Sequence, residues 1–210
     1  MLRVALFAGG DLTFFTRHFD YFVGIDRGSL FLLENGLPLT MAVGDFDSVS
    51  KEAFTMIKEK AEHLVIAKQE KNDTDTELAL KEVFARFPDA QVTIFGAFGG
   101  RLDHLLSNLF VPSDPALAPH MTQIELRDEQ NVVTFCPAGK HLVRQENGMT
   151  YIAFMTDGEA DLEIVGAKFA LTPANFFKKK IYASNAFIGT PIEVTVPSGY
   201  LIILQSKDRS

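Results

Sequence analysis

The chain has 210 residues, nearly half of them apolar, and a net charge of −7 at neutral pH. This length suits one large or two small domains with a substantial core. The basic residues are scattered, except for Lys178–Lys180, which argues against a nucleic-acid groove. No apolar run approaches the roughly 20 residues that span a bilayer. The single cysteine, Cys136, excludes an internal disulfide and fits a reducing cytoplasm. We therefore expect a cytoplasmic protein with no membrane or nucleic-acid partner.

The first half alternates short apolar runs with helix-like segments. This alternation predicts an α/β fold with an open, mostly parallel sheet and flanking helices. Ser50 is placed to cap a helix over 51–60, and Thr74 with Glu77 fits a capping box at the start of another helix. The expected strands cover residues 3–8, 21–25, 39–43, 63–67 and 91–95.

Two carboxylates, Asp45 and Asp47, follow the third expected strand directly after Gly44. If the backbone stays extended there, side chains two residues apart point the same way and the two anions repel. Hard oxygen ligands of this kind suit Mg²⁺, which takes one or two carboxylates, several waters and a substrate phosphate. The alternative is an Asp-rich turn that caps the next helix.

A glycine-rich segment, Gly99-Gly-Arg-Leu-Asp-His104, follows the fifth expected strand and leads into a helix. Glycines between a strand and a helix let backbone N–H groups approach an anion, and Arg101 can grip a phosphate with two hydrogen bonds. All five expected strands are followed by Gly, Asp or both, and the carboxyl ends of parallel strands lie at one edge of a sheet. The pattern predicts a site for a metal-bridged polyphosphate at that edge.

Beyond a proline-rich break over 112–119, short β-rich runs separated by turn signals replace the helical pattern. Their spacing predicts an antiparallel β-sandwich or barrel. We place the domain boundary after Cys136, giving domains 1–136 and 137–210, although 126–135 could also complete the first domain. Ser184 and Asn185 are expected in a turn between two strands. The expected strands are 123–126, 132–135, 141–144, 151–155, 162–165, 180–183, 192–196 and 200–204.

Several of these segments, taken together and in this order, resemble the thiamine pyrophosphokinase family. The segments are Gly24-Ile-Asp-Arg-Gly28, Gly44-Asp-Phe-Asp-Ser48, Lys71-Asn-Asp-Thr-Asp-Thr-Glu-Leu-Ala79, Gly99-Gly-Arg-Leu-Asp-His104 and Ser184-Asn185. The resemblance implies an α/β catalytic domain, a β-sandwich thiamine-binding domain and a homodimer. It also implies the Mg²⁺-dependent transfer of diphosphate from ATP to thiamine, with AMP as the second product. One departure is Asn72, which stands where the family commonly has Asp, and Asp73 is a candidate to compensate for it.

The resemblance also implies roles for individual residues. Asp45, Asp47 and Asp75 are expected to hold Mg²⁺, directly or through water, while Lys71 and Arg101 hold the transferring diphosphate. Asp103 is expected either to orient thiamine or to accept the hydroxyl proton, and His104 is the other candidate base. Ser184 and Asn185 are expected to contact the thiamine pyrimidine from the second subunit. The remaining expected ATP-binding residues are Asp26, Arg27, Gly28, Ser48, Asp73, Thr74, Gly99 and Gly100.

Two other functions fit parts of the sequence. Asp45-Phe46-Asp47 could be the metal motif of a nucleotide-sugar glycosyltransferase. The chain could also be a sensor that binds thiamine or a nucleotide without chemistry. A sensor is disfavoured because crowded carboxylates gain little in a pure binder of an anionic ligand.

Overall fold

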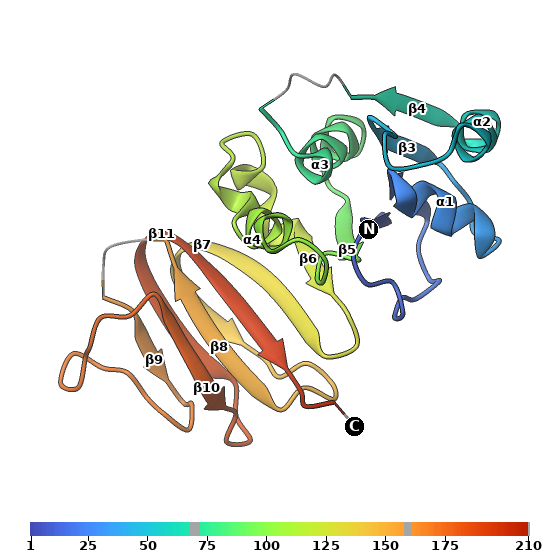
Figure 1. Ribbon diagram of the computed structural model, residues 1–210. Coiled ribbons are helices and arrows are strands. Elements are labelled where there is room, and N and C mark those ends of the chain that lie inside the picture. The colour runs from blue at the N-terminus through green and yellow to red at the C-terminus, as the bar shows by residue number, and fades with distance from the viewer. Residues whose placement is uncertain (68–71, 158–160, 210) are drawn as a thin grey trace. The chain divides into compact units, whose positions relative to one another are not determined.

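The computed structural model describes residues 1–67, 72–157 and 161–209 (Figure 1). The chain divides into two compact units, Met1–Glu129 and Gln130–Ser210. We call them the N-terminal and C-terminal units. This division falls seven residues before the boundary expected after Cys136. The expected boundary would cut through β7 (Asn131–Val143), which is one continuous strand of the C-terminal unit.

The N-terminal unit is built on a parallel sheet with the strand order β6-β5-β1-β2-β3-β4. Every neighbouring pair in this order is parallel. The sequence predicted this for the first five strands, but it placed the run 123–126, which forms β6, among the antiparallel strands of the second half; in the structure this run extends the parallel sheet beside β5. The chain first runs from β1 toward β4 and then returns to β5 on the other side of β1. The strand order therefore reverses between β1 and β5, the position at which open α/β sheets bind ligands. The strands are β1 (Arg3–Phe7), β2 (Tyr21–Ile25), β3 (Met41–Gly44), β4 (His63–Ile66), β5 (Gln91–Phe95) and β6 (Ile124–Arg127).

Two helices of the N-terminal unit, α2 and α3, begin at capping residues that the sequence predicted. Ser50 accepts a hydrogen bond from the Ala53 N–H at the start of α2, and Thr74 forms the predicted capping box with Glu77 at the start of α3. The α-helices are α1 (Arg27–Glu34), α2 (Lys51–Lys60), α3 (Asp75–Arg86) and α4 (Leu102–Leu109). Two short 3-10 helices, η1 (Val111–Ser113) and η2 (Ala118–Gln123), follow α4. No helix in the described ranges is both long and apolar enough to span a membrane.

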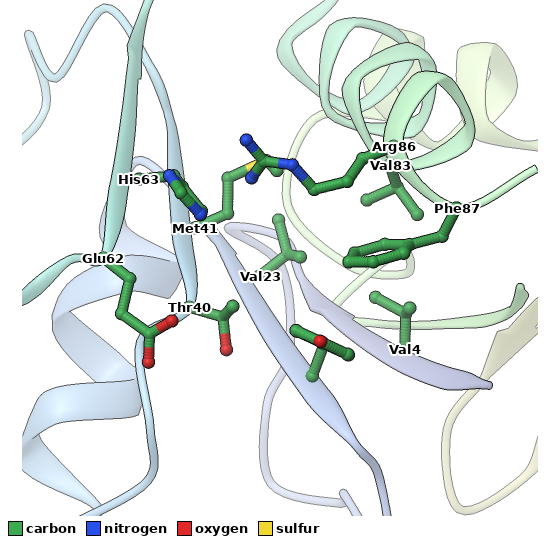
Figure 2. Close-up of a pocket in the computed structure, with 10 residues that line it drawn as sticks. Val4, Val23, Thr40, Met41, Glu62, His63, Val83, Arg86 and Phe87 are labelled. Atoms are coloured by element: carbon green, nitrogen blue, oxygen red, sulfur yellow. The ribbon is translucent and has the colours of Figure 1, made fainter.

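The helices cover both faces of the parallel sheet. Leu32 of α1 and Ile57 of α2 pack into a phenylalanine-rich core that includes Phe7, Phe22 and Phe95. On the opposite face, Val83 of α3 lies beside sheet residues such as Val23, as Figure 2 shows. The central strands are thus covered on both faces, and the loops that follow their carboxyl ends remain accessible.

The C-terminal unit is an antiparallel sheet with the order β10-β8-β11-β7, in which β9 also pairs with β11. Its strands are β7, β8 (Tyr151–Thr156), β9 (Glu163–Val165), β10 (Ile181–Ala186) and β11 (Ile192–Ser206). Both halves of β11 contribute to one core, because Val194 and Ile203 belong to the same buried cluster. The antiparallel architecture was predicted correctly.

Two expected turns in this unit lie within strands. The segments 137–139 and 197–199 carry Pro and Gly, and the sequence predicted a strand break at each. In the structure, β7 and β11 continue through these segments. The register of their pairing shifts between Val196, which pairs with Gly139, and Tyr200, which pairs with Pro137. Because the irregular segments of both strands face each other, the strands can bend together without losing their pairing.

Candidate active site

The loop after β3 brings the first two predicted metal ligands to the carboxyl edge of the sheet. Gly44 has φ 147°, which L side chains rarely adopt, and the following Phe46 has φ 57°. Phe46 is buried and packs against Phe54 of α2, with ring centroids 5.1 Å apart. The Asp47 N–H donates to Asp45 Oδ1 over 3.1 Å. The loop is thus anchored by its aromatic residue, and it carries one carboxylate on each side of that anchor.

Asp26, at the end of β2, holds this loop from the neighbouring strand. Its Oδ1 accepts a hydrogen bond from the Phe46 N–H over 3.0 Å, and Asp26 itself has φ 45°. The pKa of Asp26 is raised to about 6, chiefly by burial and also by the charges of Asp75, Asp45 and Asp47, against the lowering effect of the Phe46 hydrogen bond. Acidic groups from three different loops therefore act on one another at this edge.

The raised pKa of Asp26 predicts a pH-dependent cost to stability. Between the ordinary value of 3.8 and about 6, the folded state holds a proton that the unfolded state has lost, so stability falls as pH rises through this window. Asp26→Asn removes the titrating group but keeps an oxygen that can accept the Phe46 N–H. Relative to wild type, we expect the free energy of unfolding of the variant to increase by about 2 kcal/mol as the pH rises from 4 to 7.5. This value allows for solvent screening of the half-buried group.

This prediction is checked by urea unfolding of both proteins at the two pH values in the absence of divalent metal. Groups that do not interact with Asp26 titrate equally in both proteins and cancel in the difference. An equal pH dependence for the two proteins would show that Asp26 is not protonated in the folded state at pH 4–6.

The acidic residues at this edge suit a hard cation, although the structure does not show a closed coordination shell. No three His, Cys, Asp or Glu side chains in the described ranges form a group that could hold a metal ion. Mg²⁺ does not require one, because it keeps several waters and uses one or two carboxylates plus substrate phosphates. The charges of Asp75, Asp45 and Asp47, which add to the effect of burial on the pKa of Asp26, produce a repulsion that a divalent cation relieves.

The loop before α3 supplies the third predicted metal ligand. Asp75 is the first residue of α3, directly after the capping residue Thr74. The Thr74 N–H donates to Glu77 Oε2 over 2.7 Å, and the Glu77 N–H donates to Thr74 Oγ1 over 3.2 Å. The Asp73 carboxylate forms an ion pair with Lys81. Lys71, which we predicted to hold the diphosphate, lies outside the described residues.

The loop after β5 lies beside the loop after β1. The Gly10 N–H donates to the Gly96 carbonyl over 3.0 Å, and the Asp11 N–H donates to the Phe98 carbonyl over 2.9 Å. The buried Asn108 of α4 also fixes this loop, because its Nδ2 donates to the Ala97 carbonyl over 3.0 Å. Asn108 could not be singled out from the sequence, since an amide near the end of a helix has no distinctive pattern.

The predicted phosphate-binding residues of this loop are exposed. Gly99 and Gly100 have φ 84° and 69°, so their backbone follows a path that favours glycine. The Arg101 guanidinium grips the Asp103 carboxylate through two hydrogen bonds, and this contact lowers the pKa of Asp103. His104 is exposed on the first turn of α4.

Three other predicted ATP-binding residues lie close to these loops in the chain. Arg27 and Ser48 are exposed, at the start of α1 and in the loop after β3. Gly28 is buried, and a Cβ at this position would clash with the Phe7 carbonyl oxygen. The close approach of α1 to β1 therefore explains this glycine without reference to a ligand.

Ser184 and Asn185 lie within β10 and not in the turn that the sequence predicted. The pairing of β10 with β8 shifts between Tyr182 and Asn185, and Ser184 has φ 60°, so these residues form a bulge. Ser184 is exposed. Asn185 is buried: its Oδ1 accepts from the Phe169 N–H over 2.9 Å, and its Nδ2 donates to the Phe169 carbonyl over 2.7 Å. Asn185 therefore holds the 169 segment in place.

A pocket of about 240 Å³ lies away from these loops, against the α3 face of the sheet (Figure 2). It is lined by residues near the amino ends of the strands, including Val4, Tyr21 and His63, and by Arg86 and Phe87 at the end of α3. None of the predicted site residues lines it. Because catalytic loops follow the carboxyl ends of parallel strands, we do not assign this pocket to the active site.

Comparison with known proteins adds evidence independent of this geometry. Residues 14–124 match the family model described as "Thiamin pyrophosphokinase, catalytic domain", and residues 140–201 match "Thiamin pyrophosphokinase, vitamin B1 binding domain". The chain is 30% identical to the thiamine pyrophosphokinase of Bacillus subtilis, over 99% of this chain and all of that protein.

Solved structures agree with these matches. A thiamin pyrophosphokinase family protein from Enterococcus faecalis is 43% identical, with a TM-score of 0.90 over 99% of this chain and all of that one. The yeast enzyme, at 14% identity, shares the fold with a TM-score of 0.74 over 97% of this chain and 85% of that one. The matches do not favour the glycosyltransferase or sensor alternatives. The chain is therefore a member of the thiamin pyrophosphokinase family.

Proposed function

We propose that this chain transfers a diphosphate group from ATP to the hydroxyl of thiamine, giving thiamine diphosphate and AMP, with Mg²⁺ bound at the carboxyl edge of the parallel sheet. The observation that carries the proposal is the hydrogen bond from the Phe46 N–H to Asp26 Oδ1, which brings Asp26 to the loop that carries Asp45 and Asp47 at that edge. The charge of Asp75 also acts on Asp26 there. A glycine-rich loop and Arg101 stand at the same edge, where open α/β sheets bind their ligands.

In this proposal the carboxylates of Asp45, Asp47 and Asp75 hold the metal, directly or through water. When bound, Mg²⁺ neutralises charge on the phosphate oxygens as the transfer proceeds. Asp26 holds the loop after β3 in position by accepting a hydrogen bond from the Phe46 N–H. Most of the catalysis in such transfers comes from positioning and charge neutralisation, so the rigidity of this loop is a functional property.

The remaining residues place the two substrates. The thiamine hydroxyl gives its proton to Asp103 or His104, and its oxygen bonds to the β-phosphorus of ATP. The bond from that phosphorus to the oxygen bridging the α- and β-phosphates breaks, and this oxygen leaves with AMP. Lys71 and Arg101 hold the transferring diphosphate, and the N–H groups of Gly99 and Gly100 help to bind ATP. Arg101 must exchange its contact with Asp103 for the phosphate, which frees Asp103 to orient the thiamine hydroxyl.

We also propose that the protein is a cytoplasmic homodimer in which Ser184 and the segment held by Asn185 contact the thiamine pyrimidine. A cytoplasmic location fits the single cysteine. Dimerisation is supported by exposed apolar side chains on one segment of the C-terminal unit: Val165, Phe169, Phe177, Ile181 and Ile188. Light scattering at micromolar concentration should therefore give twice the 23.3 kDa chain mass. A monomer mass would contradict this part of the proposal.

The transfer itself is tested by incubating the protein with ATP, Mg²⁺ and thiamine and separating the products chromatographically. We expect AMP and thiamine diphosphate in equal amounts, and no AMP when thiamine or Mg²⁺ is omitted. Formation of ADP with thiamine monophosphate would mean that a single phosphoryl group is transferred. Binding of both substrates without any product would instead support the sensor alternative.

A further inference from the structure

Lys81 of α3 links the loop that enters α3 to the segment that follows η1. Its Nζ lies 2.9 Å from Asp73 Oδ2, in the loop that enters α3, and 2.6 Å from Asp114 Oδ2, directly after η1. The three side chains are largely shielded, with 27%, 31% and 17% of the Lys81, Asp73 and Asp114 side chains exposed. An ion pair with this degree of shielding is less weakened by solvent than one at the open surface.

The contact between Lys81 and Asp114 favours the charged form of both groups. Burial by itself would lower the pKa of Lys81, but its hydrogen bonds to Asp114 and Asp73 give a net increase. The same contact with Lys81 lowers the pKa of Asp114. The bridge therefore consists of one cation between two anions, and removal of the cation would leave two carboxylates facing each other.

Asp114 is a fixed anchor for this bridge. Its Oδ1 accepts the Ala116 N–H over 2.7 Å, and its backbone carbonyl accepts the N–H groups of Leu117 and Ala118. Lys81 is fixed by α3, whose first turn is held by the capping box of Thr74 and Glu77. Asp73 is the third member, and it stands two residues before Asp75. The bridge thus connects the segment that precedes Asp75 to a rigid part of the N-terminal unit.

We propose that Lys81 is a positioning residue: by holding Asp73 to Asp114, it fixes the segment that presents Asp75 to the metal. This inference rests on the proposed function and assigns a role within that site to a residue that the sequence did not single out. It also implies that Asp73 is not one of the metal ligands, because Lys81 already pairs with its carboxylate. Asp73 therefore does not substitute for the Asp that the family commonly has at position 72; it anchors the loop.

The test compares Lys81→Met, which keeps the length of the aliphatic side chain but removes the charge, with Lys81→Arg, which restores a cation. Lys58→Met is the matched control, because Lys58 is exposed on α2 and forms no ion pair with any residue in the described ranges. The first readout is Mn²⁺ binding in the presence of α,β-methylene ATP, followed by electron paramagnetic resonance. The second readout is kinetic: kcat and the Mg²⁺ concentration that gives half-maximal activity are measured separately. Thermal unfolding reports whether each variant is folded.

We expect Lys81→Met to weaken Mn²⁺ binding and raise the half-saturating Mg²⁺ concentration by about tenfold or more, the size typical of lost supports behind metal ligands. Lys81→Arg should recover most of this loss, and Lys58→Met should match wild type. If Lys81→Met fails to fold, Asp114→Asn keeps the Lys81–Asp73 pair in a less anchored form and should weaken Mn²⁺ binding by a smaller factor.

Two failures can be told apart. If wild type forms no AMP from ATP and thiamine, the proposed function is wrong. If wild type is active but folded Lys81→Met, or Asp114→Asn where that variant replaces it, binds Mn²⁺ as tightly as wild type, only the positioning role of Lys81 is overturned. A variant with a lower melting temperature but unchanged metal binding also overturns that role, because a merely structural role predicts that result.

Discussion

Asp47→Ala should remove nearly all turnover while leaving the protein folded. Asp47 is exposed at the end of the loop after β3, so its removal creates no cavity in the core. A bound metal supplies several kcal/mol of charge stabilisation in the transition state. Because each 1.4 kcal/mol is a factor of ten in rate, loss of a ligand should reduce kcat by roughly a hundredfold to ten-thousandfold. The measurement is AMP formation with saturating ATP and thiamine over a range of Mg²⁺ concentrations.

Asp89→Ala is the matched control for this variant. Asp89 is also an exposed aspartate of the N-terminal unit, but it lies between α3 and β5, at the amino edge of the sheet. It should keep wild-type kcat. If Asp47→Ala also keeps wild-type kcat with Mg²⁺ and ATP, the assignment of Asp47 to the metal is wrong.

Gly28→Ala should destabilise the protein strongly, because α1 packs directly on β1 at this residue. The added Cβ would clash with the Phe7 carbonyl oxygen and lie 2.7 Å from the Phe7 carbonyl carbon, both backbone atoms that cannot rotate away. The helix α1 would have to separate from β1, in the middle of the phenylalanine-rich core. We expect the free energy of unfolding to fall by about 3 kcal/mol or more, measured by urea denaturation.

Gly9→Ala provides the control, because a Cβ at Gly9 would meet no atom within 4 Å. We expect its free energy of unfolding to stay within about 0.5 kcal/mol of wild type. Equal stabilities for Gly28→Ala and Gly9→Ala would contradict the close packing of α1 against β1.

The N-terminal unit could be predicted well from the sequence because its signals are local. Strand runs such as 21–25 and 91–95 coincide with β2 and β5, and the capping residues Ser50 and Thr74 mark the starts of their helices. The parallel pairing then follows from the alternation of strands and helices, and it brings the loops after the strands to one edge.

The C-terminal unit was harder to predict because Pro and Gly have two uses in sheets. They end strands at turns, and they also permit bends within long strands when the paired strand is irregular at the same place. The pairing of Pro137 with Tyr200 and of Gly139 with Val196 can be seen only in three dimensions. The bulge at Ser184 resembles a turn in sequence because Ser and Asn favour turns as well as bulges.

Site residues with a motif around them could be proposed from the sequence, whereas the residues that support them could not. Asp45 and Asp47 stand out as paired acids after a strand. Lys81 lies in the middle of a helix, where a lysine is ordinary, and Asp114 lies in a proline-rich segment that had no other signal than a break. Their relationship depends on how α3 lies beside the segment after η1, which no local pattern encodes.

The central claim is that acidic loops at one edge of the parallel sheet gather around a metal-bridged nucleotide. The most direct measurement is anomalous diffraction from crystals grown with Mn²⁺ and α,β-methylene ATP. We predict a manganese peak among the carboxylates of Asp45, Asp47 and Asp75, in contact with the triphosphate and on the side of Arg101. A metal and nucleotide bound elsewhere, for example in the pocket at the amino ends of the strands, would contradict this claim.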